Sequence, residues 1–546
     1  MHIPAGNAIM NVVMLKSNVI HRYGMLAAAV VFASVADAIA SLLATTLTIG
    51  TPFSDGAVLQ RGMPIPVWGH ATPGGIVAVE FAGQRHTAKA GSDGSWRVEL
   101  HPLEASRVGR TLTTTESAPG WLFDTTIDVV EVKDVLVGEV WFASGQSNMN
   151  CPVWGGNARF RQGDGAVLRE ITNLAHVRYM KNERIWSVSP RRIESKWRSM
   201  TPDNLRSHSV SALAFLFARD IALALDVPVG IVDSSWGGTG IDAWTPRSGY
   251  DGCDPLLDEI AAMPVGEVFD PSRKIGGINS AVQQPTVLFN GLVASWAPMA
   301  MRGFIWYQGC HNNADSSQLY LAKLRALYAG WSREFANPAL RMYLVQLAPY
   351  RTSWMNICMA QSEFADTEPN AEIVVAADQG NFDDIHPNNK ETIAHRLALH
   401  ALRRDYGFGA IESRSPVFRS AEFRDGGAVL RFDNVRSWYV YSPDRSHDAP
   451  FELAGADGVW HPARIANFAR RKNAKTGEMV EADELTGPEI ILSSDSVRRP
   501  ENVRYMGSPR TAGILFNEMS LPLGPFDGAV CAALHGAGRQ VNGKEK

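Results

Sequence analysis

Ser147 is the one hydroxyl in the run Gly145-Gln-Ser-Asn148, and a serine in this setting could act as a nucleophile. The residues before it, 135–143, are apolar and rich in β-branched side chains, which predicts a short buried strand. A serine at the end of such a strand lies where open α/β sheets bind their ligands. Met149 stands where the Gly-x-Ser-x-Gly motif of α/β-hydrolases has its second glycine, so this is a different motif. A polar turn after a core strand is the alternative interpretation.

A serine hydroxyl needs a base to take its proton, and that base is itself oriented by an acid. His386 can supply the base, and Asp383 stands three residues before it. A loop with this spacing lets the aspartate reach Nδ1 of the imidazole while Nε2 faces Ser147. Taken alone, the Asp-x-x-His pattern is equally consistent with a solvated loop.

The negative charge of a tetrahedral intermediate needs hydrogen-bond donors that are already in position. The pair Gly237-Gly238 follows a predicted strand and can present backbone N–H groups. Gln308 and Asn312 follow another predicted strand and offer side-chain amides. The chain therefore supplies a nucleophile, a glycine donor, an amide donor, and then an acid and a base.

The composition limits the class of protein. A chain of 546 residues is too long for one core, so we expect two to four domains. The apolar fraction of 45% and charged fraction of 20% are ordinary for a globular protein, and a net charge of -4 gives no reason to expect a nucleic-acid partner. The five cysteines have no Cys-x-x-Cys spacing, so neither a zinc site nor a redox motif is predicted.

The amino terminus predicts export. Lys16 and Arg22 precede an apolar run at 24–36 that is too short to span a bilayer, and small residues follow at a spacing suited to cleavage. An uncleaved anchor is the alternative, and no later segment has the length of a transmembrane helix.

The pattern of elements divides the chain into regions. We predict a signal peptide at 1–40, an N-terminal β domain at 45–134, an α/β domain at 135–405, a C-terminal β domain at 410–527 and a flexible tail at 528–546. In the central region apolar strands alternate with helical patterns, which indicates parallel strands with crossover helices. The predicted central strands are 135–143, 227–233, 303–307, 342–347 and 373–377, and the predicted helices are 211–225, 317–335 and 389–403.

Several blocks together resemble the sialate O-acetylesterase family of the SGNH-hydrolase superfamily, and the resemblance runs from about 48 to 526. The blocks Gly-Gln-Ser-Asn-Met and Trp-Tyr-Gln-Gly are specific to that family, whereas Asp-x-x-His is not. The stretches that carry the resemblance are 53–61, 138–149, 227–239, 305–309, 384–390, 502–505 and 521–526.

The resemblance implies a three-layer α/β/α catalytic domain with a parallel sheet, flanked by β-sandwich-like domains. It also implies a hydrolase without metal or other cofactor that removes acetyl groups from sugar hydroxyls, with an O-acetylated carbohydrate as its partner. We therefore expect no nucleic-acid partner and no membrane association after signal removal, and the oligomeric state stays open. The sugar stays open too, because sialate would require a cationic group that the sequence does not identify.

The resemblance also implies roles for individual residues. Ser147 would be the nucleophile and His386 the base, with Asp383 rather than Asp384 as the acid. The N–H of Ser147, Gly238 and Asn312 would form the oxyanion hole. The residues expected to bind substrate are Gln146, Asn148 and Gln308.

Two positions depart from the family pattern. Cys310 replaces a glutamate, and Cys358 with Met359 replaces an Arg-Glu pair. In some related acetylesterases that second glutamate or its equivalent partners the catalytic histidine, so a non-catalytic carbohydrate-binding descendant is an alternative, as is a hydrolase of another ester or amide. An exported chain with both cysteines suggests the hypothesis of a Cys310–Cys358 disulfide, against the alternative of two separate buried thiols.

Overall fold

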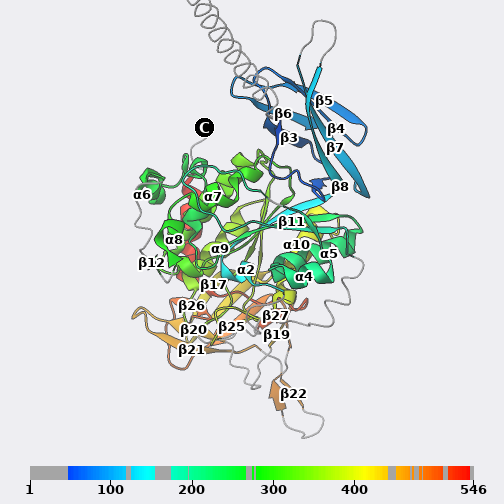
Figure 1. Ribbon diagram of the computed structural model, residues 1–546. Coiled ribbons are helices and arrows are strands. Elements are labelled where there is room, and N and C mark those ends of the chain that lie inside the picture. Colours follow the sequence, from blue (N-terminus) through cyan, green and yellow to red (C-terminus); the bar gives the residue numbers. More distant parts are fainter. Residues whose placement is uncertain are drawn as a thin grey trace, which may run out of the picture.

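The computed structural model describes residues 47–541, apart from 119–124, 154–173, 195, 266–273, 276–277, 381, 441–449, 468–469, 473–478, 482–483 and 508–514. Within this range the protein has a mixed α/β fold (Figure 1), with an N-terminal β region, a central α/β region and a C-terminal β region that follow one another through the molecule. The signal peptide predicted at 1–40 lies outside the described residues.

The N-terminal region consists of short strands with one buried face. Its strands are β1 (Thr48–Ile49), β2 (Val58–Gln60), β3 (Ile65–His70), β4 (Ile76–Phe81), β5 (Gln84–Lys89), β6 (Ser95–Leu100) and β7 (Ser106–Ala118). One sheet has the order β1-β3-β6, while β4 pairs with β5 and β7. In β6, exposed and buried residues alternate, because successive side chains of a strand point to opposite faces.

A single long strand, β8 (Thr125–Gly145), connects this region to the catalytic centre. Its first part pairs antiparallel with β7, and its last part pairs in parallel with two central strands. The predicted domain boundary between 134 and 135 therefore falls inside one continuous strand. Glu139 lies on it, buried, and binds Gln60, Arg61 and Arg302. Burial opposes ionisation of Glu139, but these partners outweigh it and lower its pKa.

The central sheet is almost entirely parallel. Besides β8 its strands are β9 (Val177–Lys181), β10 (Arg198–Ser199), β11 (Val229–Ser235), β14 (Gly303–Tyr307), β15 (Arg341–Val345) and β16 (Ala371–Val374). The order is β10-β9-β11-β8-β14-β15-β16, and only the pairing of β10 with β9 is antiparallel. The chain builds first to one side of β8 and then to the other, so the carboxyl ends of β11, β8 and β14 meet at a switch point.

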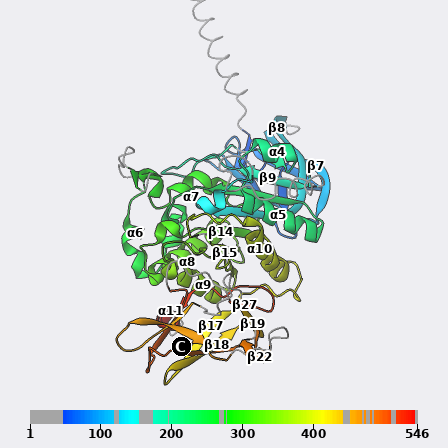
Figure 2. The same cartoon turned by 90° about the horizontal axis from the view of Figure 1, so that it is seen from below.

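Helices surround this sheet. The α-helices in this part of the chain are α2 (Ser147–Asn150), α4 (Pro202–Ser207), α5 (Ala212–Leu225), α6 (Asp258–Ala262), α7 (Val287–Leu292), α8 (Ser317–Glu334), α9 (Met355–Thr367) and α10 (Lys390–Asp405). Helix α5 packs against α10, and α8 packs against α9; in Figure 2, β14 and β15 lie between α8 and α10. The side chains of Ser211, Ser316 and Asn389 cap α5, α8 and α10 by accepting backbone N–H groups.

The predicted central helices and strands are present within a few residues of their expected ends. Helix α9 was not predicted, although its buried residues include Ile357, Gln361 and Phe364, which have the three- and four-residue spacing of a helix face. Other elements of the central region also went unpredicted. They are β9, β10, α2, α4, α6, α7, β12 (Lys274–Ile275), β13 (Ile278–Asn279) and the 3₁₀ helices η3 (Ile241–Trp244), η4 (Arg247–Tyr250), η5 (Pro255–Leu257), η6 (Ser280–Gln283), η7 (Ala294–Trp296) and η8 (Cys310–Asn312).

The C-terminal region returns to antiparallel sheet. Its strands are β17 (Val417–Arg424), β18 (Gly427–Asp433), β19 (Ser437–Val440), β20 (Phe451–Ala454), β21 (Trp460–Ile465), β22 (Arg470–Lys472), β23 (Met479–Glu481), β24 (Glu484–Thr486), β25 (Glu489–Ser493), β26 (Asn502–Tyr505), β27 (Leu515–Asn517) and β28 (Phe526–Asp527). The main sheet has the order β17-β18-β25-β21-β20-β26-β28.

The tail at 528–546, which we predicted to be flexible, contains a helix. Helix α11 (Gly528–Val541) occupies most of it and packs against α9 and β26. Its start is stabilised by Asp527, whose Oδ1 accepts the N–H groups of Ala529 and Val530. An alanine-rich segment with such a cap favours a helix, which the sequence analysis underestimated.

Candidate active site

The turn that carries Ser147 is fixed by the strands on either side of it. Gly145 ends β8 with φ of +134°, and a Cβ at this position would lie 2.3 Å from the carbonyl oxygen of Tyr307. Only glycine fits there. The N–H of Gln146 donates to that same carbonyl at 3.0 Å, and the N–H of Trp236 donates to the carbonyl of Gly145 at 3.0 Å. The turn is therefore held by β14 and β11, and Ser147 begins helix α2.

The predicted nucleophile and base lie in contact. Nε2 of His386 is 2.9 Å from Oγ of Ser147, although the two residues are 239 positions apart in the sequence. The hydroxyl can donate to Nε2 when the ring proton is on Nδ1. The imidazole is 29% exposed, so it lies at the surface of the site. This geometry suits proton transfer from Ser147 to His386.

The acid beside the imidazole is Asp384, and the assignment to Asp383 is corrected. Oδ1 of Asp384 lies 3.3 Å from Nδ1 of His386, and this carboxylate is 12% exposed. The same oxygen accepts the backbone N–H of His386 at 3.0 Å, so a tight turn brings residues two apart to the same side. The carboxylate of Asp383 is 88% exposed and lies 3.7 Å from Nη2 of Arg351. The sequence predicted an acid three residues before His386, whereas the carboxylate beside the imidazole stands two residues before it.

The backbone N–H groups of Ser147 and Gly238 have no acceptor among the residues that the structure describes, as is also the case for those of Asn148 and Gly237. Gly238 has φ of +73°, and its carbonyl oxygen accepts from Nε2 of Gln283 at 2.8 Å, which fixes the orientation of the loop. The adjacent Gly237 backs onto the nucleophile, because a Cβ there would lie 3.4 Å from Cβ of Ser147. The N–H groups of Ser147 and Gly238 are thus available for a developing oxyanion.

Asn312 is held by three hydrogen bonds. Its Oδ1 accepts from the backbone of Ile241 at 3.1 Å and from Gln308 at 2.8 Å, while Nδ2 donates to Asp315 at 2.9 Å. One hydrogen of Nδ2 is therefore committed to Asp315, and the second is the one that could reach an oxyanion.

The three residues predicted to bind substrate form hydrogen bonds within the protein. Gln146, Asn148 and Gln308 are all buried. Oε1 of Gln146 accepts the N–H groups of Gly309 and His311, and Gln308 binds Thr239, Asn312 and Tyr320. These hydrogen bonds hold the active-site loops together, and contact of the three residues with substrate stays a prediction.

The sequence analysis missed Lys390, which lies beneath the site. Its side chain is buried, Nζ donates to Oδ1 of Asn148 at 2.7 Å, and it lies 5.4 Å from the centre of the Tyr307 ring. Burial lowers the pKa of Lys390 to about 8, against weaker opposing effects of Cys151, Cys310 and Asp384. Its position four residues after His386, at the start of α10, was the available signal.

The Cys310–Cys358 disulfide is not formed, since both cysteines are free thiols. Burial raises the pKa of Cys310 to about 12, and burial together with the neighbouring Cys310 raises the pKa of Cys358. The alternative interpretation of two separate thiols agrees with the structure, in which Cys358 is buried and Cys310 is partly exposed. Among the described residues, no group of three or more His, Cys, Asp or Glu side chains is placed to hold a metal ion. No helix within the described ranges is long and apolar enough to cross a membrane.

Comparisons with known proteins agree on the class of chemistry. The family model described as "Carbohydrate esterase, sialic acid-specific acetylesterase" matches residues 137–403. The chain is similar to the sialate O-acetylesterase of Rattus norvegicus, with 26% identity covering 74% of this chain and 81% of the relative. It is similar to that of Homo sapiens, with 27% identity covering 69% and 74%. A solved carbohydrate acetylesterase from Xanthomonas citri shares 32% identity with a TM-score of 0.71, covering 88% of this chain and 99% of that one.

Proposed function

This chain belongs to the carbohydrate esterase family of sialic acid-specific acetylesterases, and we propose that it deacetylates sugar hydroxyls through an acetyl-Ser147 intermediate. The protein is a carboxylic ester hydrolase that acts on O-acetylated carbohydrates. The proposal assigns that reaction to particular residues of the chain.

In the first half of the reaction, Oγ of Ser147 attacks the acetyl carbonyl carbon while Nε2 of His386 takes the hydroxyl proton. Asp384 stabilises the imidazolium that results. The negative oxygen of the tetrahedral intermediate accepts hydrogen bonds from the N–H groups of Ser147 and Gly238 and from the second amide hydrogen of Asn312. The intermediate collapses, the bond to the sugar oxygen breaks, and His386 returns its proton to that oxygen.

In the second half, His386 takes a proton from a water molecule that attacks acetyl-Ser147. Collapse of the second intermediate breaks the bond to Oγ and releases acetate, and the proton passes from His386 to Ser147.

The observation that carries the proposal is the contact of Ser147 Oγ with His386 Nε2 at 2.9 Å, with Asp384 at 3.3 Å on the other ring nitrogen. Three side chains in this order perform acyl transfer on several unrelated folds. The non-catalytic alternative is not favoured, because the relatives and the solved structure are named as esterases.

Finer features belong to the same proposal. The parallel sheet order, with α5 and α10 packed together and α8 and α9 packed together, supports the SGNH-type three-layer α/β/α layout. The β regions before and after it would be its flanking domains, and the signal at 1–40 would direct export. Acetate release from 9-O-acetyl sialate and from acetylated xylan, measured side by side, would identify the sugar.

Labelling with diethyl p-nitrophenyl phosphate tests the nucleophile directly. This reagent phosphorylates a serine only when a neighbouring base activates it. We expect one diethylphosphoryl group on the peptide that contains Ser147, with loss of p-nitrophenyl acetate hydrolysis, and no label in His386→Ala. Label on another residue, or full activity in the labelled protein, would contradict the assignment.

A further inference from the structure

A large groove lies away from the catalytic serine, where the C-terminal sheet meets helices α9 and α11. Its volume is about 1420 Å³, and its lining includes neither Ser147 nor His386. Side chains of α8 and α9 form one part of the lining, β17 a second, and the first residues of β21 and β26 a third. A volume above the 300–1,000 Å³ range of ordinary ligand pockets suits an extended ligand.

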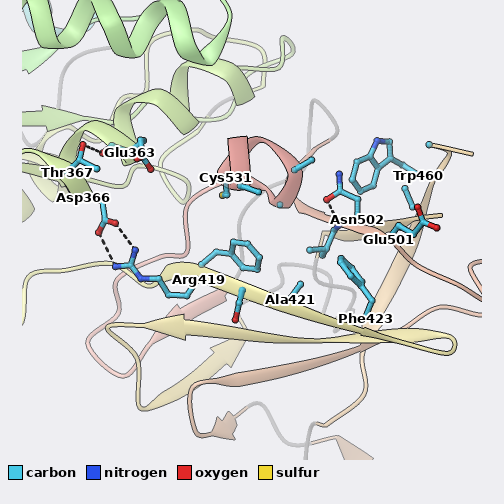
Figure 3. A pocket seen from close by; sticks show the side chains of 18 of the residues that line it. Glu363, Asp366, Thr367, Arg419, Ala421, Phe423, Trp460, Glu501, Asn502 and Cys531 are labelled. Atoms are coloured by element: carbon cyan, nitrogen blue, oxygen red, sulfur yellow. Dashed lines mark hydrogen bonds and ion pairs between the residues drawn. The ribbon is translucent and has the colours of Figure 1, made fainter. Parts of the chain in front are cut away.

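One wall of the groove is strand β17, which lies at an edge of the C-terminal sheet. Among the described residues β17 pairs only with β18. Its residues Ala421 and Phe423 face the groove, and Figure 3 shows Trp460 and Asn502 across from them, with Cys531 of α11 nearby. Phe423 is 37% exposed, so its side chain is accessible from the groove.

The aromatic residue opposite is held rigidly. The guanidinium of Arg504 lies 4.3 Å from the centre of the Trp460 ring. Arg504 is in turn paired with Glu452 through two hydrogen bonds. An indole with a fixed orientation binds a ligand without losing much side-chain freedom.

The remaining lining is polar and acidic. The amide of Asn502, the hydroxyl of Ser420 and the carboxylate of Glu501 offer donors and acceptors beside the rings. The groove is lined by four acidic and two basic side chains, and one of the basic ones, Arg419, is paired with Asp366 and Asp433. This excess of negative charge disfavours a sugar that carries a carboxylate.

We infer that this groove is a second, non-catalytic binding site for a neutral stretch of oligosaccharide. Sugar rings have an apolar face that packs on aromatic rings and a rim of hydroxyls that bond to amides and carboxylates. The inference rests on the proposed function only in that the ligand belongs to a carbohydrate substrate. A polymer held here would raise the local concentration of its acetyl groups near the enzyme.

Isothermal titration calorimetry of the full chain with cellohexaose, xylohexaose and 3′-sialyllactose tests the site. These probes carry no acetyl ester, so the result does not depend on catalysis by Ser147. We expect cellohexaose or xylohexaose to bind, and Trp460→Ala and Ala421→Trp each to weaken that binding by at least about tenfold. Phe408→Ala removes a ring that is 41% exposed outside the groove, and this matched control should bind like the wild type.

Thermal unfolding of each variant shows whether it is folded. Ala421→Trp fills the groove without removing a packed side chain, so it carries the test if Trp460→Ala is unstable. Hydrolysis of p-nitrophenyl acetate should be unchanged in all three variants. The inference is overturned if neither neutral hexasaccharide binds, if the groove variants bind as well as Phe408→Ala, or if only sialyllactose binds. By contrast, full esterase activity in Ser147→Ala would overturn the proposed function and leave the binding result standing.

Discussion

Nζ of Lys390 lies 2.7 Å from Oδ1 of Asn148, so a buried ammonium group holds the residue that follows the nucleophile. Nδ2 of Asn148 donates to the carbonyl oxygen of Ile385 at 3.2 Å, and Ile385 precedes the catalytic histidine. One amide therefore connects the neighbour of Ser147 with the neighbour of His386. The relative position of nucleophile and base depends on this connection.

Replacing Lys390 should affect turnover more than substrate binding. Lys390→Met removes the hydrogen bond to Asn148, and we expect kcat for p-nitrophenyl acetate to fall by about 10–100-fold with little change in KM, because small displacements of catalytic groups are costly. Lys133→Met, at a site 67% exposed, is the matched control. An unchanged kcat in Lys390→Met would contradict the positioning role.

The titration of Lys390 predicts a dependence of stability on pH. Its pKa is lowered to about 8 in the folded protein, below the value of about 10.4 for an unfolded chain. Between these values the unfolded chain binds more protons, so the free energy of unfolding should rise with pH by up to about 3 kcal/mol. Below pH 8 the contribution is constant and unfavourable. Urea unfolding from pH 7 to 10.5 should show this rise in the wild type relative to Lys390→Met, and parallel curves would disprove it.

Replacing Ser147 should remove catalysis and leave the fold intact. We expect Ser147→Ala to reduce kcat for p-nitrophenyl acetate by at least about 10³-fold, because only binding and the oxyanion donors remain. The control is Ser144→Ala, three residues earlier on β8, since Oγ of Ser144 is buried and has no hydrogen-bond partner within the described residues. Wild-type turnover in Ser147→Ala would disprove the nucleophile assignment.

The two neighbouring aspartates give a matched pair of variants. Asp384→Ala removes the carboxylate next to Nδ1 of His386, and we expect kcat to fall by about 10²–10⁴-fold, as for other triad acids. Asp383→Ala changes an 88% exposed side chain and should cost less than about tenfold. Steady-state kinetics of both variants separates them, and the opposite ranking would restore the original assignment to Asp383.

Free thiols can be counted by chemistry. Without reductant but in 6 M guanidinium chloride, Ellman's reagent should titrate all five cysteines of the chain. In the native protein Cys310 and Cys358 should react slowly, because burial raises the pKa of both thiols and the thiolate is the reactive form. Three titratable thiols in the denatured protein would indicate one disulfide.

Much of the fold follows from local patterns in the sequence. Strand β14 was predicted from a short continuous apolar run, and helices α5 and α8 were predicted within a residue or two from the 3.6-residue spacing of their apolar side chains. Helix α11 had local signals that went unused, its alanines and the Asp527 cap, whereas α9 escaped prediction because it is buried on more than one side. Burial of that kind is a property of neighbours that are distant in the sequence.

For the site, as for the fold, some features could be predicted from the sequence and others required the tertiary structure. The sequence by itself singled out Ser147 and His386 as candidates, because a lone serine after a buried strand and a histidine after a polar turn are local features of residue type and order. Only the tertiary structure decided that Asp384 faces the imidazole, that Gln308 is buried, and that the cysteines remain thiols. The direction of a side chain depends on loop dihedrals, and contacts between segments such as β8, β14 and α10 set those dihedrals. Lys390 is the clearest case, since a lysine becomes a buried, weakened base only through the residues that the fold places around it.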